Sequence, residues 1–527
     1  MLDRAISVSD ILRTTSRGMP QRTAIVDEAG SLSYFEFDVD VDRFASALSK
    51  IGVRAGDRVA YLLWNQRELL ISYFAIARVG ALTVSLNFRL TPEELSYQLA
   101  AADCKAIIVD KDLAELASKA ISISNLSIFQ IVAGAEAPPG QLAFADALRG
   151  HAEDIVHFPT VSADADSGIW FTSGTTGRPK GAVVKHRSAV ASATLCAILF
   201  GFPDEVRALG VAPLFHRAAV ENIALPVIMR GGTNFLFKKL SPAQTLVYLE
   251  MYRINAAFIV PTMAWQLIHE PSAGNKTLPH LTHWISASAP LPPVLAERIQ
   301  EQFKLPNGVL NAYGITEMLL VSACPPAMLA KKPGTAGLPA PNTQIVIHDE
   351  THGILPNGET GEILISGPTA FSHYLNNEQA TRDAIINLNG TAWYRSGDVG
   401  VIDADGYLAI KDRKKDMIIS GGENVYCAEV EQVLSENPAI QEVSVVGIPD
   451  EKWGEIVVAA VVSNANHIID LDTIAKGCAT LASYKRPREI VLLEQLPRNS
   501  FGKVQKDKLR AIVREKLEVA RQQLRAS

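Results

Sequence analysis

The sequence predicts an α/β protein with a large N-terminal domain followed by a small α+β C-terminal domain. Over the first third of the chain, apolar segments of strand length alternate with helical segments, as in a parallel-type sheet covered by helices. Beyond about Gly337, short strands separated by Gly and Asp turns indicate a small antiparallel region. A chain of 527 residues is also too long for a single hydrophobic core.

The first elements follow in the order strand, helix, strand, helix, strand. A hydroxyl cap at Thr91, with Pro92 and two glutamates behind it, marks the start of the second helix. Later apolar runs each lead into a loop, where ligands of open α/β sheets bind. We expect the first elements at 58–63, 65–80, 81–87, 91–103 and 105–110, and the later runs at 208–215, 256–261, 283–288 and 308–313.

The C-terminal third changes in texture. Strands are expected at 343–350, 361–367, 406–412 and 416–421, before helix and strand alternate again over 428–463. The charged run DRKKD at 412–416 lies between two of these strands. We therefore place a domain boundary at 412–415, with an N-terminal domain at 1–411 and a C-terminal domain at 416–527.

Composition excludes several classes of protein. A net charge of −6 argues against a nucleic-acid binder, which usually carries a basic surplus. The five cysteines are scattered, without metal or disulfide spacing, which favours reduced thiols in the cytoplasm. The N-terminus lacks the apolar segment of a secretory signal, and no apolar run approaches the ~20 residues that span a bilayer.

One loop carries an unusual concentration of hydrogen-bond donors. In FTSGTTGRPKGAVVKH, residues 171–186, flexible glycines and Thr or Ser hydroxyls precede Lys180. Such a loop can surround phosphate oxygens, and the lysine supplies the counter-charge. It is no Walker loop, because Gly181 follows the lysine and strands are expected on both sides. The alternative is a solvated hairpin turn.

The string TSGTTGRPKG resembles the phosphate loop of the adenylate-forming (AMP-binding) superfamily, and the similarity extends over most of the chain. Six further motifs arrive in the family's order: YGITE, GEILISGP, WYRSGD, DRKKDMIISGGENVY, VVGIPDEKWGE and PRNSFGKVQK. The similarity is greatest to fatty-acid and aryl acid CoA ligases. It implies an acyl-CoA synthetase that uses ATP, Mg²⁺ and CoA and forms an acyl-AMP intermediate. It also implies that 412–415 is a hinge, about which a mobile C-terminal domain at 416–527 rotates between the two half-reactions.

The resemblance implies a role for each matching residue. The β- and γ-phosphates would be held by Thr172, Ser173, Gly174, Thr175, Thr176, Gly177 and Lys180. Tyr313, with Gly314 beside it, would stack on adenine, Thr316 would contact the α-phosphate, and Glu317 would ligate Mg²⁺. The ribose would be bound by Asp398 and Arg413, Lys415 would be the hinge residue, and Lys503 would stabilise the charge of the adenylation transition state. His216 would lie beside the acyl carboxylate. The CoA site would comprise Gly421, Gly422, Trp453, Tyr484, Arg486 and Arg488.

The nature of the acid stays open at this point. Candidate wall residues are mostly apolar, which favours an aliphatic fatty acid or an aromatic monocarboxylate: Phe215, Val220, Ile315 and Met318. Arg217 has two interpretations, since it either meets a second carboxylate of a polar acid or points to solvent. The basic C-terminal segment, 505–527, is expected to be a solvated helix, with contact to an anionic membrane as the alternative.

Rival functions share the fold. A ligase that loads a separate carrier protein would make the adenylate but not use CoA. A luciferase-like oxygenase would need oxygen chemistry for which the sequence offers no independent sign. A non-catalytic nucleotide-binding protein would be expected to have lost Lys503, Glu317 or the phosphate loop, and all are present. We expect a cytoplasmic enzyme without nucleic-acid partners, and a homodimer is compatible with the sequence.

Overall fold

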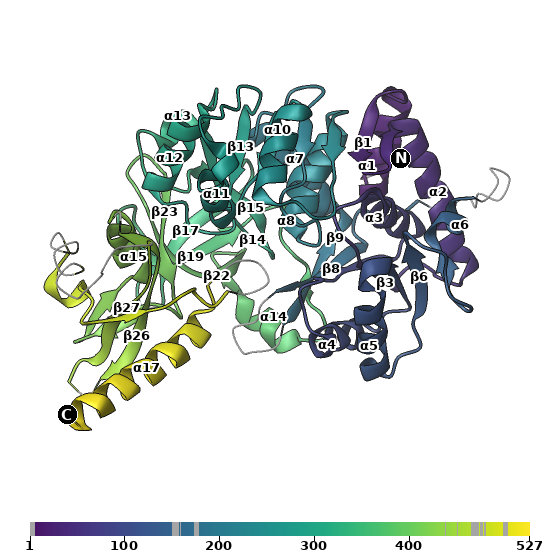
Figure 1. The fold of residues 1–527 in the computed structure, drawn as a ribbon. Coiled ribbons are helices and arrows are strands. Elements are labelled where there is room, and N and C mark those ends of the chain that lie inside the picture. Colours follow the sequence, from purple (N-terminus) through teal and green to yellow (C-terminus); the bar gives the residue numbers. More distant parts are fainter. Residues whose placement is uncertain are drawn as a thin grey trace. The chain divides into compact units, whose positions relative to one another are not determined.

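The computed structural model describes residues 6–149, 158, 160–172, 179–437, 439–450, 452–464, 474, 478, 481–498 and 504–526. The chain forms two compact units (Figure 1). The first comprises Met1–Leu291, Leu295–Ile345 and Ile365–Tyr394, and the second Pro292–Val294, Val346–Leu364 and Arg395–Ser527. The hinge expected at 412–415 describes a rotation of the C-terminal domain, and a single structure does not test a rotation, so the hinge stays a prediction.

An eight-stranded sheet in the first unit confirms the parallel pattern read from the sequence. Strand β3 pairs in parallel with β4 and with β5. Strands β8 and β9 pair antiparallel at the other end of the sheet. The strand order is β20 (His373–Tyr374), β9 (Lys180–Lys185), β8 (Asp166–Thr172), β4 (Leu82–Ser85), β3 (Arg58–Leu62), β5 (Ala106–Asp110), β6 (Phe129–Ala133) and β7 (Leu142–Ala143).

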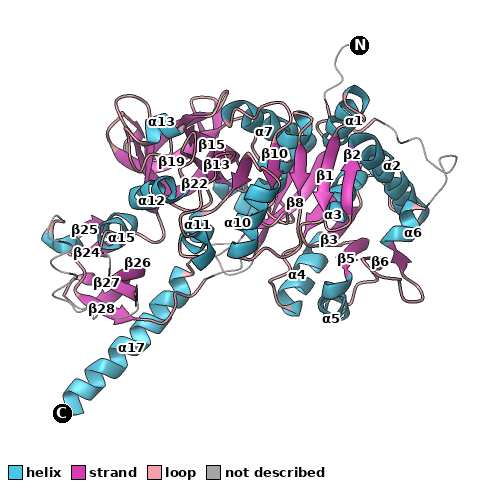
Figure 2. Ribbon diagram, turned by 45° about the horizontal axis from the view of Figure 1, so that its top comes forward, coloured by secondary structure: helices cyan, strands magenta, loops and turns pink. Residues whose placement is uncertain are grey.

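Alternate residues of β3 face two different hydrophobic cores. Val59 and Tyr61 belong to one core, whereas Ala60 and Leu62 belong to the other. This is the period of two that a strand requires, and burial on both faces makes its sequence apolar throughout. Helices α4 (Pro92–Ala102) and α5 (Ala114–Ser124) lie side by side over the second core (Figure 2).

A nine-stranded sheet carries the central part of the chain. Its middle strands pair in parallel, and β14 and β15 form an antiparallel pair near one edge. The strand order is β16 (Leu338–Pro339), β15 (Leu319–Cys324), β14 (Val309–Ile315), β13 (His283–Ser286), β12 (Ala256–Phe258), β10 (Arg207–Leu209), β11 (Thr233–Phe235), β1 (Thr23–Asp27) and β2 (Gly30–Ser33).

The helix signals of the sequence match the observed ends. Thr91 caps α4 and forms a capping box with Glu94, and α3 ends at Gly80, which has a left-handed φ of 79°. Besides α4 and α5, the helices before residue 395 are α1 (Val8–Gly18), α2 (Tyr34–Lys50), α3 (Arg67–Val79), α6 (Phe144–Leu148), α7 (His186–Leu199), α8 (Arg217–Ala219), α9 (Leu225–Met229), α10 (Pro242–Met251), α11 (Pro261–Ile268), α12 (Pro293–Phe303), α13 (Pro326–Leu329) and α14 (Glu378–Ala384). Short turns of other helix types are η1 (Lys111–Leu113), the π-helical η3 (Val220–Ala224) and η4 (Pro271–Ala273).

The second unit contains the short strands expected beyond Gly337. In one sheet β18 (Gly353–Leu355), β17 (Gln344–Asp349), β19 (Thr360–Ser366), β22 (Thr391–Ile402) and β23 (Leu408–Arg413) follow one another. Strand β21 (Ile385–Leu388) pairs with the start of β22, and both of these segments belong to the first unit. The other sheet contains β25 (Glu423–Val425), β24 (Ile418–Ser420), β27 (Gly454–Ser463), β26 (Ile440–Asp450) and β28 (Glu489–Leu492). With them go helices α15 (Cys427–Ser435) and α17 (Lys506–Ala526), and η5 (Ser483–Lys485).

A search of the described residues for a helix both long and apolar enough to cross a membrane found none.

Candidate active site

The base of the predicted phosphate loop is a strand pair. Thr172 at the end of β8 lies opposite Lys180 at the start of β9, and the Thr172 hydroxyl donates to the Lys180 carbonyl at 3.4 Å. The Lys180 ammonium lies 5.1 Å from the centre of the Tyr374 ring. The two ends of the predicted loop therefore meet. Five of the predicted phosphate-binding residues lie outside the described residues: Ser173, Gly174, Thr175, Thr176 and Gly177.

The motif YGITE forms a tight turn between β14 and β15, which we call the Tyr313–Leu319 turn. Tyr313 is buried, and a Cβ atom on Gly314 would lie 2.0 Å from the Leu319 carbonyl oxygen, so only glycine fits there. Leu319 itself has a left-handed φ of 46°, which is strained for a residue with a side chain. The turn is thus held in an unfavourable conformation by its surroundings.

Three donors bind three successive carbonyl groups of this turn. Arg217 Nη1 donates to Thr316 at 2.5 Å, and the Phe371 amide donates to Glu317 at 2.6 Å. The Thr369 hydroxyl donates to the Met318 carbonyl. Because three consecutive carbonyl groups accept hydrogen bonds from other segments of the chain, the backbone at Thr316 and Glu317 is held in place.

The Glu317 carboxylate is buried and bonded to Tyr374. The Tyr374 hydroxyl donates to Glu317 Oε1 at 2.6 Å, and the Tyr394 hydroxyl lies 3.2 Å from that of Tyr374. Burial, and then the charge of Glu317, raise the pKa of both tyrosines, which keeps them protonated as donors. Tyr374 therefore connects two residues that the sequence assigned to separate motifs, Lys180 and Glu317.

These surroundings fit a bound cation. No described Lys, Arg or His side chain forms an ion pair with Glu317, so its buried carboxylate has the Tyr374 hydroxyl as a hydrogen-bond donor but no counter-charge from the described residues. Buried charges are normally paired or coordinate a metal. Within the described part of the chain no three His, Cys, Asp or Glu side chains gather around a metal site. A hard cation here would therefore take its remaining ligands from phosphate oxygens and water, as Mg²⁺ does.

His216 lies at the start of α8 as an uncharged imidazole. Burial, together with the nearby Arg89 cation, lowers the pKa of His216 to about 3. The side chain is therefore neutral at neutral pH and does not compensate a carboxylate by charge. Of the expected wall residues, Phe215, Val220 and Met318 are buried, whereas Ile315 is half-buried.

Arg217 does not point to solvent, so that alternative is wrong. Its side chain is 1% exposed, and Nε binds Glu221 Oε2 at 2.8 Å. Glu221 lies one helical turn further along, and its other oxygen accepts from Tyr73 at 3.5 Å. The carboxylate that Arg217 was expected to find on a substrate is thus present in the protein itself.

The predicted ribose residues lie together in the second unit. Asp398 on β22 is opposite Arg413 on β23, and Arg413 Nε lies 3.1 Å from Asp398 Oδ1. The Asp398 amide also bonds to the Ser396 hydroxyl at 3.0 Å. Asp398 is buried, whereas the Arg413 side chain is 37% exposed. This strand pairing brings together two residues that are 15 positions apart in the sequence, as their predicted common role at the ribose requires.

Part of the predicted CoA site also assembles in the second unit. Gly421 and Gly422 have left-handed φ angles of 62° and 86°, and the Gly421 amide donates to the Trp453 carbonyl at 2.7 Å. The Arg488 guanidinium lies 4.0 Å from the centre of the Trp453 ring. The two other predicted residues are less closely tied to this group. Arg486 donates to the Leu481 carbonyl, and Tyr484 is half-buried beside Lys485. The predicted catalytic residue, Lys503, lies outside the described residues.

Sequence reasoning missed the side chains that support the site. Tyr394 occurs in the quoted string WYRSGD and Tyr374 lies six positions after GEILISGP, yet no role followed from the strings alone. Glu221 carried a usable signal, because an acid four residues after Arg217 on a helix is at ion-pair spacing. The contact between Glu317 and Tyr374 had no comparable signal in the sequence, because the two residues are 57 positions apart.

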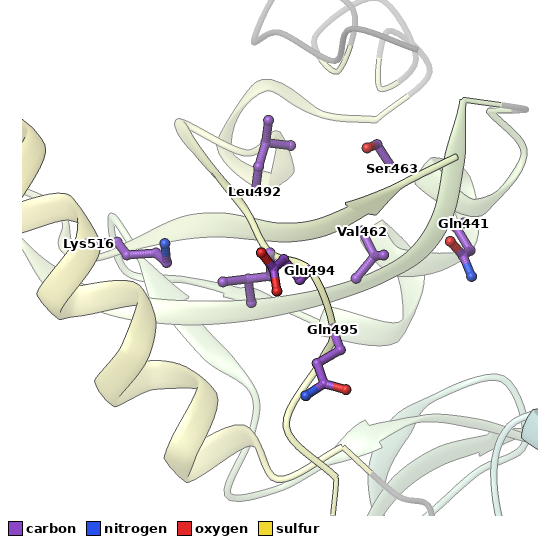
Figure 3. Close-up of a pocket in the computed structure, with 8 residues that line it drawn as sticks. Gln441, Val462, Ser463, Leu492, Glu494, Gln495 and Lys516 are labelled. Carbon is purple, nitrogen blue, oxygen red and sulfur yellow. The ribbon is translucent and has the colours of Figure 1, made fainter. Parts of the chain in front are cut away.

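An open pocket of about 670 Å³ lies apart from these residues, within the second unit (Figure 3). It contains none of the predicted site residues. Its lining residues are Gln441, Val462, Ser463, Leu492, Leu493, Glu494, Gln495 and Lys516.

Comparison with known proteins gives concordant results. Residues 12–375 match the family of AMP-binding enzymes, and residues 429–503 match the AMP-binding enzyme C-terminal domain. The feruloyl-CoA synthase of Amycolatopsis sp. is 35% identical over 499 residues, 94% of this chain and 96% of that protein. The indoleacetate–CoA ligase of Aromatoleum aromaticum is 36% identical over 500 residues, with the same shares. The structure of o-succinylbenzoate CoA synthetase from Bacillus subtilis, in complex with its acyl-adenylate intermediate, has a TM-score of 0.83 at 28% identity. It covers 95% of this chain and 97% of its own.

Proposed function

Because this chain belongs to the family of AMP-binding enzymes, we propose that it joins an aromatic monocarboxylic acid to CoA, with conversion of ATP to AMP and pyrophosphate. It is an acid–thiol ligase of the AMP-forming type, like the relatives that align over nearly its whole length. In the first step an acid oxygen bonds to the α-phosphorus and pyrophosphate leaves. In the second, the CoA thiol loses its proton and attacks the acyl carbonyl, and AMP leaves.

The observation that supports this assignment best is the group formed by Lys180, Tyr374 and Glu317. It places a cation from the phosphate loop and a buried carboxylate on either side of one tyrosine. In our proposal Thr172 and Lys180 bind the terminal phosphates with Ser173–Gly177. Glu317 holds Mg²⁺, which when bound neutralises phosphate charge. Tyr313 and Gly314 bind adenine, and Thr316 faces the α-phosphate.

The second unit supplies the remaining groups in this proposal. Asp398 and Arg413 bind the ribose, and Lys503 approaches the reacting oxygens during adenylation. Rotation about 412–415 then brings Gly421 and Gly422 to the thiol passage. The CoA nucleotide is held by Trp453, Tyr484, Arg486 and Arg488, which stay predictions of the resemblance. A cytoplasmic location and a homodimer stay predictions of the sequence.

An aromatic acid is favoured by two considerations. The feruloyl and indoleacetate ligases are named for aromatic acids, and the predicted wall includes the buried Phe215 and Met318. Phe215 packs edge-on against Phe88, with ring centres 4.9 Å apart, and its own ring centre lies 4.2 Å from that of His216. Neutral His216 can donate or accept one hydrogen bond at the carboxylate without fixing its charge.

A panel of acids tests the proposal. The purified protein would receive ATP, Mg²⁺, CoA and aryl, aliphatic or dicarboxylic acids, with AMP and acyl-CoA quantified by mass spectrometry. We expect AMP and thioester in equal amounts, with the highest kcat/KM for an aryl acid. Preference for aliphatic acids would refute the acid class alone. Acyl-AMP without thioester would indicate a carrier-loading ligase instead.

Lys503 has a more specific expectation. Lys503→Ala should lower acid-dependent pyrophosphate release by at least 100-fold, since a positioned charge in the transition state is worth ~3 kcal/mol or more. The same variant should still convert preformed acyl-AMP and CoA to thioester at a rate close to that of the unmodified enzyme. Pyrophosphate release at the normal rate would remove Lys503 from the adenylation site.

A further inference from the structure

The guanidinium of Arg217 divides its nitrogens between two different segments of the first unit. Nε binds Glu221 at the start of η3, and Nη1 binds the carbonyl of Thr316 in the Tyr313–Leu319 turn. Nη2 is buried and has no hydrogen-bond partner among the described residues. The side chain therefore connects the segment that carries His216 to the turn that carries Thr316, across 99 residues of sequence.

This connection is rigid on the Arg217 side. Both charged side chains are 1% exposed, so water does not screen the pair. Tyr73, a buried residue of α3, donates to the free oxygen of Glu221, and burial raises the pKa of Tyr73, which keeps its proton in place. The neighbouring Asn222 is bound by the Ser192 hydroxyl of α7 at 2.8 Å. The position of Arg217 is thus fixed by contacts that do not involve the Tyr313–Leu319 turn.

The turn depends on such a contact because its backbone is strained. Leu319 has a left-handed φ, and Gly314 lies where no side chain fits. Strained backbone persists only where the surroundings determine it. Of the three donors that hold the turn, Phe371 and Thr369 bind Glu317 and Met318, and Arg217 alone contributes a charged donor, at Thr316.

We propose that Arg217 is a positioning residue for adenylation, which holds the Thr316 backbone and is itself held by Glu221. It touches no substrate in this proposal. Its effect passes through Thr316, which the proposed function places at the α-phosphate, so the inference rests on that function. It also explains why the pair stands next to His216, since both the acid and the phosphate are then aligned from one short helical segment.

A double substitution separates this role from a purely structural one. Arg217→Met with Glu221→Leu replaces both partners by apolar side chains of similar size, a change that buried ion pairs often tolerate without loss of stability. We expect a folded protein, with a thermal midpoint close to that of the unmodified enzyme. The kcat of pyrophosphate release should fall by about 10- to 100-fold, the range in which small misplacements of reacting groups act. The KM for ATP should change less than threefold, since the phosphate contacts of the loop remain.

Two further variants test the route through Thr316. Arg217→Lys has one nitrogen and cannot bind Glu221 and Thr316 as the guanidinium fork does, so it should recover at most part of the lost rate. Thr316→Val removes the hydroxyl that Arg217 positions. In the Thr316→Val protein, the double substitution should lower the kcat of pyrophosphate release by less than a further threefold, because the effects of substitutions at residues that act through one another are not additive. Full additivity would overturn the proposal.

Arg78 provides a matched control. Its side chain is 2% exposed and paired with Asp38 at 2.6 Å and Asp42 at 2.8 Å, among the helices α1, α2 and α3. Arg78→Met should lower the thermal midpoint yet keep kcat per folded molecule. Unchanged pyrophosphate release in the folded Arg217→Met, Glu221→Leu protein would refute the positioning role. An inactive unmodified enzyme across the acid panel would instead refute the proposed function, so the two failures are distinguishable.

Discussion

At the scale of single residues, the hydroxyl of Tyr374 decides how Glu317 is oriented. Tyr374→Phe keeps the ring that lies under Lys180 but removes the donor to Glu317 Oε1. Loss of a hydrogen bond behind a metal ligand typically weakens metal binding by about 10- to 100-fold. We therefore expect the Mg²⁺ concentration for half-maximal pyrophosphate release to rise by roughly tenfold, as measured by titration with Mg²⁺ at fixed ATP.

Tyr248 is a suitable control for this change, because it packs on the ring of Phe237 in a different hydrophobic core. Tyr248→Phe should leave the Mg²⁺ dependence as it is. A Tyr374→Phe enzyme with normal Mg²⁺ dependence but reduced kcat would contradict the role of Tyr374 as a support for Glu317, the proposed metal ligand.

Single residues were predictable where a motif contains them and not where contacts cross the chain. The strings around Lys180, Glu317, Asp398 and Arg413 proposed these positions as site residues, and the structure brings the last two within 3.1 Å of each other. Arg217 shows the limit, since its partner Glu221 is local but its second contact, Thr316, is 99 residues away. Only the fold brings such groups together.

At the scale of elements, the Tyr313–Leu319 turn is the feature whose shape matters most for the site. Gly314→Ala would place a methyl group against the Leu319 carbonyl, and backbone cannot move aside as a flexible side chain does. We expect at least a tenfold fall in the rate of pyrophosphate release, together with a lower thermal midpoint. Quenched time-point assays, with the acid that the acid panel identifies as the best substrate, would measure the rate of pyrophosphate release.

Gly18, the last residue of α1, is the matched control for this substitution. A Cβ atom there would meet nothing within 4 Å, and alanine favours helix over glycine by up to ~1 kcal/mol. Gly18→Ala should therefore keep full activity at equal or higher stability. Equal rates in both variants would mean that the turn tolerates a shift of its backbone.

Elements were predictable where local pattern and tertiary contacts agree. The apolar run at 208–215 was expected to be a strand, but only Arg207–Leu209 forms β10. The rest of the run is bound by one side chain, because Asn65 donates to the carbonyls of Gly210 and Ala212 and accepts from the amide of Leu214. The apolar residues of this run predicted its burial correctly. Its conformation was not predictable from the local sequence, because the side chain that binds its backbone, Asn65, lies far away along the chain.

At the scale of the whole molecule, the alternation of strands and helices predicted the architecture, because each apolar face needs a layer to cover it. The extent of the two units did not follow from that pattern. The second unit takes up Val346–Leu364 and Arg395–Ile402, although both precede the hinge proposed at 412–415. Strand pairing explains this, since β22 and β23 form a register from Asp398 to Ile402 that local sequence does not encode.

The stability of the first unit should depend on pH through His186. This histidine begins α7, and its Nδ1 accepts a hydrogen bond from the Val8 amide of α1 at 3.3 Å. Burial lowers the pKa of His186 to about 4, from an ordinary value near 6.5. A protonated Nδ1 cannot accept that bond. The folded state therefore binds fewer protons than the unfolded state between these two values.

The free energy of unfolding should accordingly be constant above pH 6.5 and fall as the pH drops towards 4, by up to about 3 kcal/mol. His186→Asn keeps an acceptor for Val8 but does not titrate, so it isolates this contribution from that of the carboxylates. Urea unfolding followed by tryptophan fluorescence reports mainly the first unit, because Trp453 is the only one of six tryptophans outside it. From pH 7 to pH 4, the unfolding free energy of the unmodified protein should fall relative to that of the variant by up to about 3 kcal/mol. Parallel pH profiles for the two proteins would show that the contact between α1 and α7 does not depend on a neutral imidazole.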